Sequence, residues 1–337
     1  MTDRPAPTSG VVEARPDLGG GRSTPSFDLP AAATPGVPGP MGSTRIGPRA
    51  FVWGVRTYVM GILNVTPDSF SGDGLLSAAG DPVGIAVETG RRMVADGADL
   101  LDVGGESSRP GHTAVPTAEE IERVVPVIGG LRAALPETPI SIDTTKAAVA
   151  AAALDAGANL VNDVWGVAAG DEMLRLAARR RVPIVLMHNR AEARYTNLMP
   201  EIVADLQAAI ERALEAGIDW NGIILDPGFG FGKTAAHNLV LLRELGLLRV
   251  LGRPIMLGTS RKSTLGKVLD LPADERLEAT LATTALGIGS GVDVVRVHDV
   301  RANVRAARMS DAIVRAHSTL DPSSAGPSGP SRSGGQP

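Results

Sequence analysis

The feature that most constrains the fold is an alternation between short apolar runs and longer segments rich in Ala, Leu, Glu and Arg. The apolar runs have the length and β-branched content of buried strands, and the segments between them have the pattern of helices. Strands that alternate with helices form parallel sheets. Strands are predicted at residues 58–63, 99–103, 139–142, 160–162, 183–187, 222–225, 254–257 and 292–297. Helices are predicted at 83–96, 118–135, 146–156, 172–180, 201–216, 236–245, 275–288 and 302–317. Eight such units predict an α/β fold, a single (β/α)₈ TIM barrel.

The two ends of the chain lack this pattern. Residues 1–43 are rich in Pro, Gly and Ala, and residues 318–337 are rich in Ser, Gly and Pro. Segments that cannot bury apolar surface do not fold by themselves, so we expect disordered tails around a barrel of residues 44–317. Met41 lies just before the barrel and is an alternative start of the protein.

Local signals add detail at both ends of the barrel. A short extra helix is expected at 263–269, after the seventh strand. Thr117 and Asp171 are expected to cap helices, because acidic residues follow each of them in the first turn. Residues 51–53 are expected to pair with residues 57–59 in a hairpin that closes the bottom of the barrel.

Polar side chains follow every predicted strand, where a purely structural barrel would have arbitrary turn residues. Any one of them has an ordinary structural explanation, such as a helix cap or a turn. Together they predict a polar ligand, because each buried polar group left unpaired costs about 1–3 kcal/mol. In strand order the residues are Asn64, the run Glu106-Ser-Ser-Arg-Pro110, Asp143, Asn162 with Asp163, Met187 with His188, Asp226, the run Ser260-Arg-Lys-Ser263, and Arg296 with His298.

The chemistry of this set indicates a ligand with two different ends. Carboxylates and an amide suit a flat heterocycle that carries several N–H donors and a carbonyl. Cationic donors suit phosphate oxygens and a carboxylate. The first group is Asp143, Asn162 and Asp226, and the second is Arg109, Lys262, Arg296 and His298.

Composition excludes several classes of function. A formal net charge of −4 without a basic stripe argues against binding to nucleic acid or to an anionic membrane surface. The absence of cysteine excludes disulfides and thiolate chemistry. No apolar run approaches the roughly 18 residues that span a bilayer, so a cytoplasmic protein is expected. Aromatic residues are scarce, and the three in predicted strand-following loops either face a ligand or plug the barrel mouth: Phe70, Phe229 and Phe231.

One glycine-rich segment looks like a nucleotide-binding motif but has the wrong spacing. The sequence Asp226-Pro-Gly-Phe-Gly-Phe-Gly-Lys-Thr234 has proline at the position where a P-loop needs its first glycine. Its alternating glycines indicate either a flexible loop or a backbone cleared for close approach of a ligand around Phe231. No HExxH or clustered histidines are present, so a tightly bound transition metal is not expected. Mg²⁺ brought in by a pyrophosphate, with Asn64 as its protein contact, is compatible with the sequence.

The chain resembles the dihydropteroate synthase family of the pterin-binding barrel superfamily over about residues 59–308. The resemblance rests on the motifs MGILNVTPDSFS, DVGGESSRPG, SIDTTK, NDVWG, DPGFGFGK, GTSRKS and VRVHDV, which occur in the expected order. It implies a transferase of folate biosynthesis that condenses 6-hydroxymethyl-7,8-dihydropterin pyrophosphate with para-aminobenzoate and releases pyrophosphate. It also implies Mg²⁺ and a homodimer formed through helices far from the first loop.

The resemblance assigns roles to individual residues. The pterin would be bound by Asp143, Asn162, Met187, Asp226, Lys262 and Arg296. The pyrophosphate and its Mg²⁺ would be bound by Asn64, Arg296 and His298. Para-aminobenzoate and the second loop would involve Ser108, Arg109, Phe231, Lys262 and Ser263. The catalytic group implied is Asn64, Arg109, Lys262, Arg296 and His298.

The sequence departs from the family pattern in three places. Ser108 stands where threonine is usual, which keeps the hydroxyl group. The first loop reads Phe-Ser-Gly-Asp-Gly, so Asp73 is moved by one position and no catalytic role is expected for it. Asn189-Arg190 follows Met187-His188 where small or amide residues are usual, so this loop is expected to differ.

Two other functions fit parts of the pattern. Methyltransferases that pass a methyl group from methyltetrahydrofolate to a corrinoid protein share the barrel and the pterin-binding acids. They need no pyrophosphate site, so Arg109, Lys262 and His298 favour the synthase. The other alternative is a non-catalytic paralogue that binds a pterin, but Asn64 and Arg109 are both kept.

Overall fold

A computed structural model describes residues 41–66, 81–106, 115–165 and 170–315. Residues 1–40 of the first predicted tail, the whole second predicted tail of residues 318–337, and residues 316 and 317 at the predicted end of the barrel lie outside the described residues. Phe70, Asp73, Ser108 and Arg109 do so as well. Ser43, which our prediction placed in the first tail, already belongs to a strand. Within the described part, no helix is long and apolar enough to cross a membrane.

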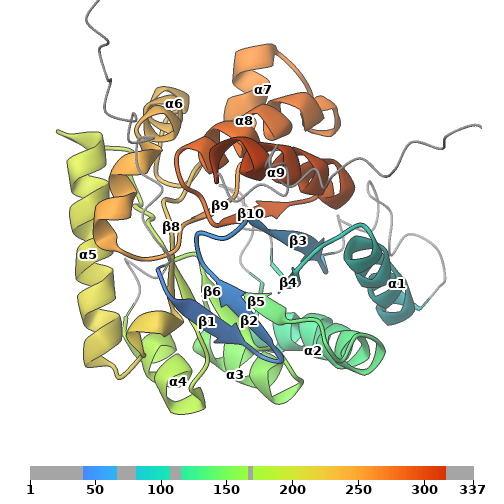
Figure 1. The fold of residues 1–337 in the computed structure, drawn as a ribbon. Helices are drawn as coiled ribbons and strands as arrows, with labels where there is room; N and C mark the ends of the chain where they lie inside the picture. Colours follow the sequence, from blue (N-terminus) through green and yellow to red (C-terminus); the bar gives the residue numbers. More distant parts are fainter. Residues whose placement is uncertain (1–40, 67–80, 107–114, 166–169, 316–337) are drawn as a thin grey trace, which may run out of the picture. The chain divides into compact units, whose positions relative to one another are not determined.

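All the predicted strands are present and form a parallel barrel (Figure 1). The sheet order is β8-β7-β6-β5-β4-β3-β10-β9, so neighbours in sequence are neighbours in space. The first and last strands of this order also meet, because Leu225 N–H donates to the carbonyl oxygen of Pro254 over 2.9 Å. The strands are β3 (Tyr58–Asn64), β4 (Leu100–Gly104), β5 (Ile140–Asp143), β6 (Leu160–Asp163), β7 (Ile184–Met187), β8 (Ile223–Asp226), β9 (Met256–Leu257) and β10 (Val294–Val297).

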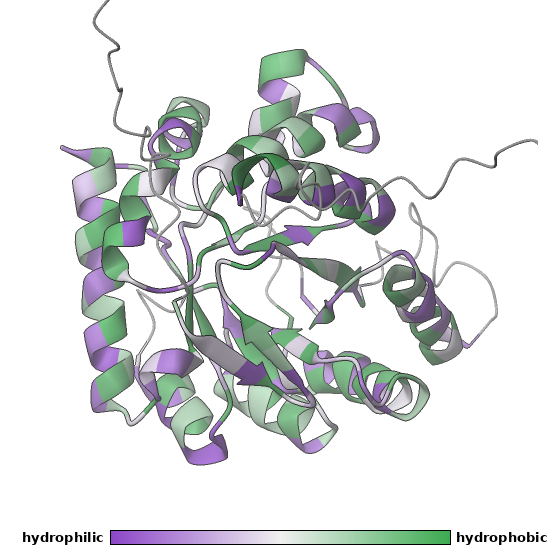
Figure 2. Ribbon diagram, viewed as in Figure 1, coloured by the Kyte–Doolittle hydropathy of each residue, from purple (hydrophilic) through white to green (hydrophobic). Residues whose placement is uncertain are grey.

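Helices surround the barrel, as predicted (Figure 1). Their apolar residues recur on one face, as in α5, where Met199, Ile202, Leu206 and Ala209 are buried against the strands. In Figure 2 each outer helix accordingly carries both hydrophobic and hydrophilic residues. The helices are α1 (Pro82–Ala95), α2 (Thr117–Ala134), α3 (Ala147–Asp155), α4 (Glu172–Arg180), α5 (Leu198–Glu215), α6 (Ala235–Arg243), the extra α7 (Ser263–Leu269), α8 (Leu277–Gly289) and α9 (Val300–Val314). Short 3₁₀ turns are η2 (Trp220–Gly222), η3 (Leu245–Leu251) and η4 (Ala273–Glu275).

Of the two predicted helix caps, the position of Asp171 is confirmed and that of Thr117 is wrong. Thr117 is the first residue of α2 and not its cap, because Pro116 already occupies the cap position and fixes the backbone there. Asp171 is in the cap position of α4, but its side chain makes no capping hydrogen bond. The acidic residues after both positions do lie in the first turns, where they interact favourably with the helix dipole.

The predicted hairpin is also wrong in its pairing. The observed hairpin joins β1 (Ser43–Ile46) to β2 (Arg49–Val52), because Gly47 adopts a φ of 55° and makes a tight turn there. Residues 57–59 instead lead into and begin β3, which pairs with β4 and β10.

The hairpin nevertheless closes the bottom of the barrel, as expected. Phe51 and Trp53 are fully buried, and their ring centroids lie 4.7 and 5.5 Å from that of Tyr58. They pack with residues near the amino-terminal ends of the barrel strands, including Leu100 and Leu160. This end of the barrel is therefore an apolar plug, and the opposite end is left for polar groups.

Candidate functional site

The carboxyl ends of the strands carry most of the predicted site residues (Figure 1). Strand register places them in one layer: Asp143 is opposite Asn162, and Gly104 lies between Asn64 and Asp143. On the neighbouring pair of strands, Met187 is opposite Asp226. A parallel barrel brings these ends to a single face, so residues far apart in sequence are gathered there.

An arginine lies at the centre of this face and is held by two carboxylates. Arg296 Nε is 2.6 Å from Asp102 Oδ2, and Arg296 Nη2 is 2.5 Å from Asp143 Oδ2. Asn162 Nδ2 donates to the same Asp102 oxygen over 3.0 Å. The guanidinium plane is therefore fixed in orientation, which suits stacking along a flat ring.

Asp102 is a site residue that our sequence analysis missed. Its side chain is fully buried, and its Oδ1 has no hydrogen-bond partner among the residues that the structure describes. A signal was present, because a charged residue inside an otherwise apolar strand must be paired or pay a large desolvation cost. The partner could not be identified from sequence, since Arg296 is far away along the chain.

Burial and the charges of neighbouring groups shift the pKa values of Asp143 and Arg296 in opposite directions. Burial raises the pKa of Asp143 to about 7, although the positive charge of Arg296 works against this shift. Burial lowers the pKa of Arg296, but the charges of Asp102 and Asp143 outweigh it and raise the pKa above its ordinary value. Arg296 therefore stays charged, as its ion pairs with Asp102 and Asp143 require.

A second acid and a lysine lie beside this network. Asp226 is buried, and its Oδ1 accepts a hydrogen bond from Gly228 N over 2.7 Å. Burial raises the pKa of Asp226, and the charge of Lys262 opposes that rise. Burial lowers the pKa of Lys262 to about 8, and Asp226 opposes that fall in turn. The pair offers an acceptor and a donor, and the charge of each opposes the effect of burial on the pKa of the other.

Lys262 also contacts the two aromatic residues of the loop after β8. Its Nζ donates to the carbonyl oxygen of Phe229 and lies 4.4 Å from the ring centroid of Phe231. Phe229 is fully buried and plugs the barrel, whereas Phe231 is half-buried. Ser263 is exposed and begins α7 directly after Lys262. Of the two explanations offered for the loop aromatics, a plug of the barrel mouth applies to Phe229, and a ligand contact stays a prediction for Phe231.

His298 and Asn64 lie on adjacent strands at the same end of the barrel. His298 follows β10, which pairs with β3, and Asn64 is the half-buried last residue of β3. The Nδ1 atom of His298 is 3.0 Å from Ser260 Oγ, which also accepts a hydrogen bond from the His298 backbone. Ser260 thus fixes the imidazole, a contact that our sequence analysis did not predict.

A lysine outside the predicted set connects both borders of the segment that carries Ser108 and Arg109. Lys146 Nζ donates to the Glu106 carboxylate, to Glu120 Oε2 over 2.6 Å and to the carbonyl oxygen of Val115 over 2.8 Å. Glu106 immediately precedes that segment and Val115 immediately follows it.

The described residues contain no group of three or more His, Asp or Glu side chains that could hold a metal ion. The amide oxygen of Asn64 is a suitable ligand for Mg²⁺, which keeps waters and phosphate oxygens in most of its coordination positions. The residues therefore fit an Mg²⁺ ion that arrives with a pyrophosphate, and they do not form an all-protein metal site.

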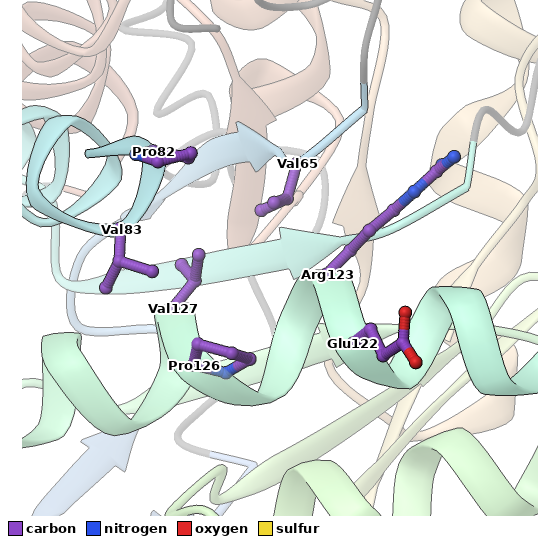
Figure 3. A pocket seen from close by; sticks show the side chains of 7 residues that line it. All are labelled: Val65, Pro82, Val83, Glu122, Arg123, Pro126 and Val127. Atoms are coloured by element: carbon purple, nitrogen blue, oxygen red, sulfur yellow. The ribbon is translucent and has the colours of Figure 1, made fainter. Parts of the chain in front are cut away.

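A hollow of about 230 Å³ lies between α1, α2 and Val65, the residue that follows β3. Figure 3 shows the side chains that line it. Its lining is mostly apolar and includes none of the predicted site residues that the structure describes. The lining residues are Val65, Pro82, Val83, Glu122, Arg123, Pro126 and Val127.

Comparison with known proteins agrees with this geometry. Residues 60–298 match the model of a family described as pterin binding enzymes. The dihydropteroate synthase of Clostridium beijerinckii is 50% identical over 80% of this chain and 99% of its own length. That of Bacillus subtilis is 48% identical over 79% of this chain and 92% of its own length.

Solved structures give the same result. Dihydropteroate synthase of Clostridium difficile, solved in the presence of pteroic acid, has a TM-score of 0.74 and 49% identity and covers 78% of this chain and 98% of its own. The Xanthomonas albilineans enzyme with 4-aminobenzoic acid has a TM-score of 0.75 and 42% identity, and covers 80% of this chain and 97% of its own. The same enzyme in complex with 7,8-dihydropteroate has a TM-score of 0.73 and 40% identity, and covers 80% of this chain and 98% of its own.

Proposed function

The chain belongs to the dihydropteroate synthases of the pterin-binding enzyme family, and from this premise we infer how its residues divide the work of the reaction. The enzyme is a transferase that condenses 6-hydroxymethyl-7,8-dihydropterin pyrophosphate with para-aminobenzoate, giving 7,8-dihydropteroate and pyrophosphate. The observation that carries the assignment of residues is the buried network of Asp102, Asp143, Asn162 and Arg296 at the carboxyl ends of the strands.

The pterin ring occupies this network in our proposal. Asp226 accepts hydrogen bonds from the exocyclic amine and a ring N–H, and Asn162 and Asp143 bind along the other edge of the ring. Lys262 donates to the ring carbonyl, Met187 packs against the ring, and Arg296 lies along its face. A structural neighbour solved in complex with 7,8-dihydropteroate supports binding of a pterin by this fold.

Para-aminobenzoate is placed beside the pterin, against Phe231 and the start of α7. Its ring packs on Phe231, and its carboxylate is met by Ser263 and Lys262 at the amino-terminal end of that helix. Ser108 and Arg109 complete this side in our proposal. A neighbour solved with 4-aminobenzoic acid supports an acceptor site in this fold.

The leaving pyrophosphate is placed on the other side of Arg296, near Asn64 and His298. Arg296, His298 and Arg109 supply donors to its oxygens, and the Asn64 amide contacts the accompanying Mg²⁺. When bound, Mg²⁺ supplies positive charge to the departing oxygens.

The reaction proceeds as a dissociative substitution at the methylene carbon. The bond from this carbon to pyrophosphate oxygen breaks, and its electron pair leaves with pyrophosphate. The electron-rich dihydropterin delocalises the positive charge that remains. The aromatic amine then forms the new C–N bond and releases a proton to solvent. The chain contributes donors fixed around the leaving group, which stabilise charge as it develops.

We also propose that the enzyme is a cytoplasmic homodimer. The support for a dimer is an apolar surface on α8 and α9, where Leu286, Met309 and Ile313 are 66%, 63% and 68% exposed. A second copy of the chain would cover side chains that are otherwise in contact with water.

The function is tested by complementation and by product analysis. A strain that lacks dihydropteroate synthase should grow without added folate intermediates when it carries this chain. The purified protein should form dihydropteroate and pyrophosphate in equal amounts from the two substrates with Mg²⁺. Tight pterin binding without any product would show instead a non-catalytic paralogue, and methyl transfer from methyltetrahydrofolate would show the corrinoid-linked alternative.

A further inference from the structure

The loop between β8 and α6, residues 227–234, is packed unusually tightly against the chain that follows β7. Three of its residues have left-handed backbone conformations: Gly228, Gly230 and Gly232. A Cβ atom on Gly228 would lie 1.8 Å from the carbonyl oxygen of His188, and one on Gly232 would lie 2.3 Å from that of Arg190. Only glycine fits at either position, so the two backbones are in direct contact.

A single ammonium group joins these two segments. Lys233 Nζ donates to the carbonyl oxygens of Gly228 and Phe231 over 3.1 and 3.0 Å, and lies 2.8 Å from Nδ1 of His188. A fourth acceptor, the carbonyl oxygen of His188, lies farther away at 3.4 Å, so the three N–H groups of the ammonium are surrounded by acceptors from both segments.

The histidine in this cluster is fixed from its other side. Burial lowers the pKa of Lys233 to about 7. In its charged form this amine can only donate, so His188 accepts at Nδ1 and keeps its proton on Nε2, which lies 3.1 Å from Asp205 Oδ2. Asp205 is held in turn by Arg190 Nη2 over 2.7 Å. Burial, and then the charge of Lys233, lower the pKa of His188 to about 4, which keeps the imidazole neutral as this arrangement requires.

Phe231 connects the cluster of Lys233, His188 and Asp205 to the proposed para-aminobenzoate site. Lys233 binds its carbonyl oxygen from one side, and Lys262 Nζ lies 4.4 Å from its ring on the other. Glycine itself allows many backbone conformations, so the position of the Phe231 backbone between these glycines, and with it the position of the ring, depends on contacts such as these.

We propose that Lys233 is a positioning residue for the acceptor substrate: by holding the Phe231 backbone, it sets the ring against which para-aminobenzoate packs. This inference rests on the proposed function of Phe231 as part of the para-aminobenzoate site. It assigns Lys233 no contact with either substrate, so its removal should affect binding of the acceptor and leave binding of the pterin unchanged.

Steady-state kinetics of Lys233→Met test this assignment. The KM for para-aminobenzoate should rise about tenfold or more, the scale of losing hydrogen bonds from a charged group. The KM for the pterin pyrophosphate should change by less than about twofold. Lys267→Met is the matched control, because Lys267 is exposed on α7, and both of its KM values should equal those of the parent enzyme.

Chemical restoration of the amine distinguishes a positioning role of Lys233 from a general structural effect of its replacement. The chain contains no cysteine, so Lys233→Cys has a single thiol, which 2-bromoethylamine converts into a lysine analogue in the unfolded protein. After refolding, the alkylated protein should regain the parent KM for para-aminobenzoate, and the unalkylated protein should not. Parent enzyme taken through the same treatment shows whether refolding itself alters the kinetics.

A double-mutant cycle tests whether Lys233 acts through Phe231. In a Phe231→Ala background, Lys233→Met should raise the KM for para-aminobenzoate by less than about twofold, because the ring that it positions is gone. Equal effects in both backgrounds would overturn the inference, as would a lower melting temperature of Lys233→Met with an unchanged KM.

If Lys233→Met does not fold, Lys233→Arg replaces it, and its cation with displaced donors should still raise this KM. Parent enzyme that forms no dihydropteroate would refute the proposed function, whereas active parent enzyme with an unaffected variant would refute only this inference.

Discussion

Arg296 illustrates how a buried charge becomes a fixed surface for a ligand. Two carboxylates, Asp102 and Asp143, hold it through separate nitrogen atoms, so the guanidinium cannot rotate without losing both ion pairs. Removing one member of a buried ion pair typically costs about 3–5 kcal/mol, because the other charge is left unpaired. The network is therefore preorganised, and little of the pterin's binding free energy is spent on ordering it.

Asp226→Asn tests the carboxylate assigned to the pterin's N–H groups. The substitution replaces one acceptor with a donor and removes charge assistance, so pterin binding should weaken by roughly 2–4 kcal/mol. Titration calorimetry with the pterin measures this directly. Asp219→Asn is the control, because Asp219 is exposed at the other end of β8 and should leave the affinity unchanged. Unchanged affinity in Asp226→Asn would remove Asp226 from the pterin site.

Lys262 makes activity and stability depend on pH in opposite directions. Its pKa in the folded enzyme is about 8, below the ordinary 10.5, so the folded state releases the proton first as pH rises. Between these two values the unfolded state binds more protons, and this lysine's contribution to stability rises with pH. Over the same range the charge needed by the ligands disappears, so kcat/KM should fall above about pH 8.

The variant that checks this is Lys262→Arg. A guanidinium stays charged throughout this range, so the fall in kcat/KM should move to higher pH or disappear even if the maximal rate is lower. A pH–rate profile from pH 6 to 10 measures it, with Lys267→Arg as the control. An unmoved alkaline limb in Lys262→Arg would assign that titration to another group.

At the scale of elements, the hairpin β1-β2 has a structural role far from the chemistry. Trp53 is fully buried, and its Nε1 donates to Thr44 Oγ1 over 2.9 Å. Trp53→Ala should destabilise the protein by about 3–5 kcal/mol, the cost of removing a large buried aromatic side chain. Denaturant unfolding measures this loss, and Val52→Ala is the control because Val52 is 41% exposed. The pterin affinity of the folded variant should be unchanged. A weakened affinity would contradict the idea that one end of the barrel provides stability and the other binds the ligands.

The elements could be predicted from sequence better than their contacts. Eight short apolar runs between helical segments specify the strands, because periodicity depends on nearby residues. The hairpin pairing was mispredicted because Gly47, a single turn residue, decides it. The strand-end acids Asp143 and Asp226 were predicted from position, whereas Asp102 and Lys233 were not. Arg296, the partner of Asp102, and His188, one of the partners of Lys233, lie on other segments of the chain, and one sequence contains no direct record of such distant contacts.

At the scale of the molecule, the barrel separates stability from function. An apolar cluster under the hairpin fills the amino-terminal end, while ion pairs occupy the carboxyl end. The protein has a formal net charge of −4, and its central cation is already paired with acids. Two anionic substrates can be accommodated only if local donors, and not the overall field, supply the attraction.

This arrangement predicts the order in which the substrates bind. Arg109 is expected to contact the pyrophosphate and Ser108 the acceptor, so we expect the acceptor site to be complete only after pyrophosphate and Mg²⁺ are bound. Para-aminobenzoate should therefore bind tightly to the enzyme with pyrophosphate and Mg²⁺ and weakly, if measurably, to the free enzyme. Calorimetric titrations of para-aminobenzoate in the presence and absence of both provide the comparison, and Mg²⁺ alone serves as the control. Equally tight binding to the free enzyme would show that the acceptor site is preformed, and the ordered scheme would then be wrong.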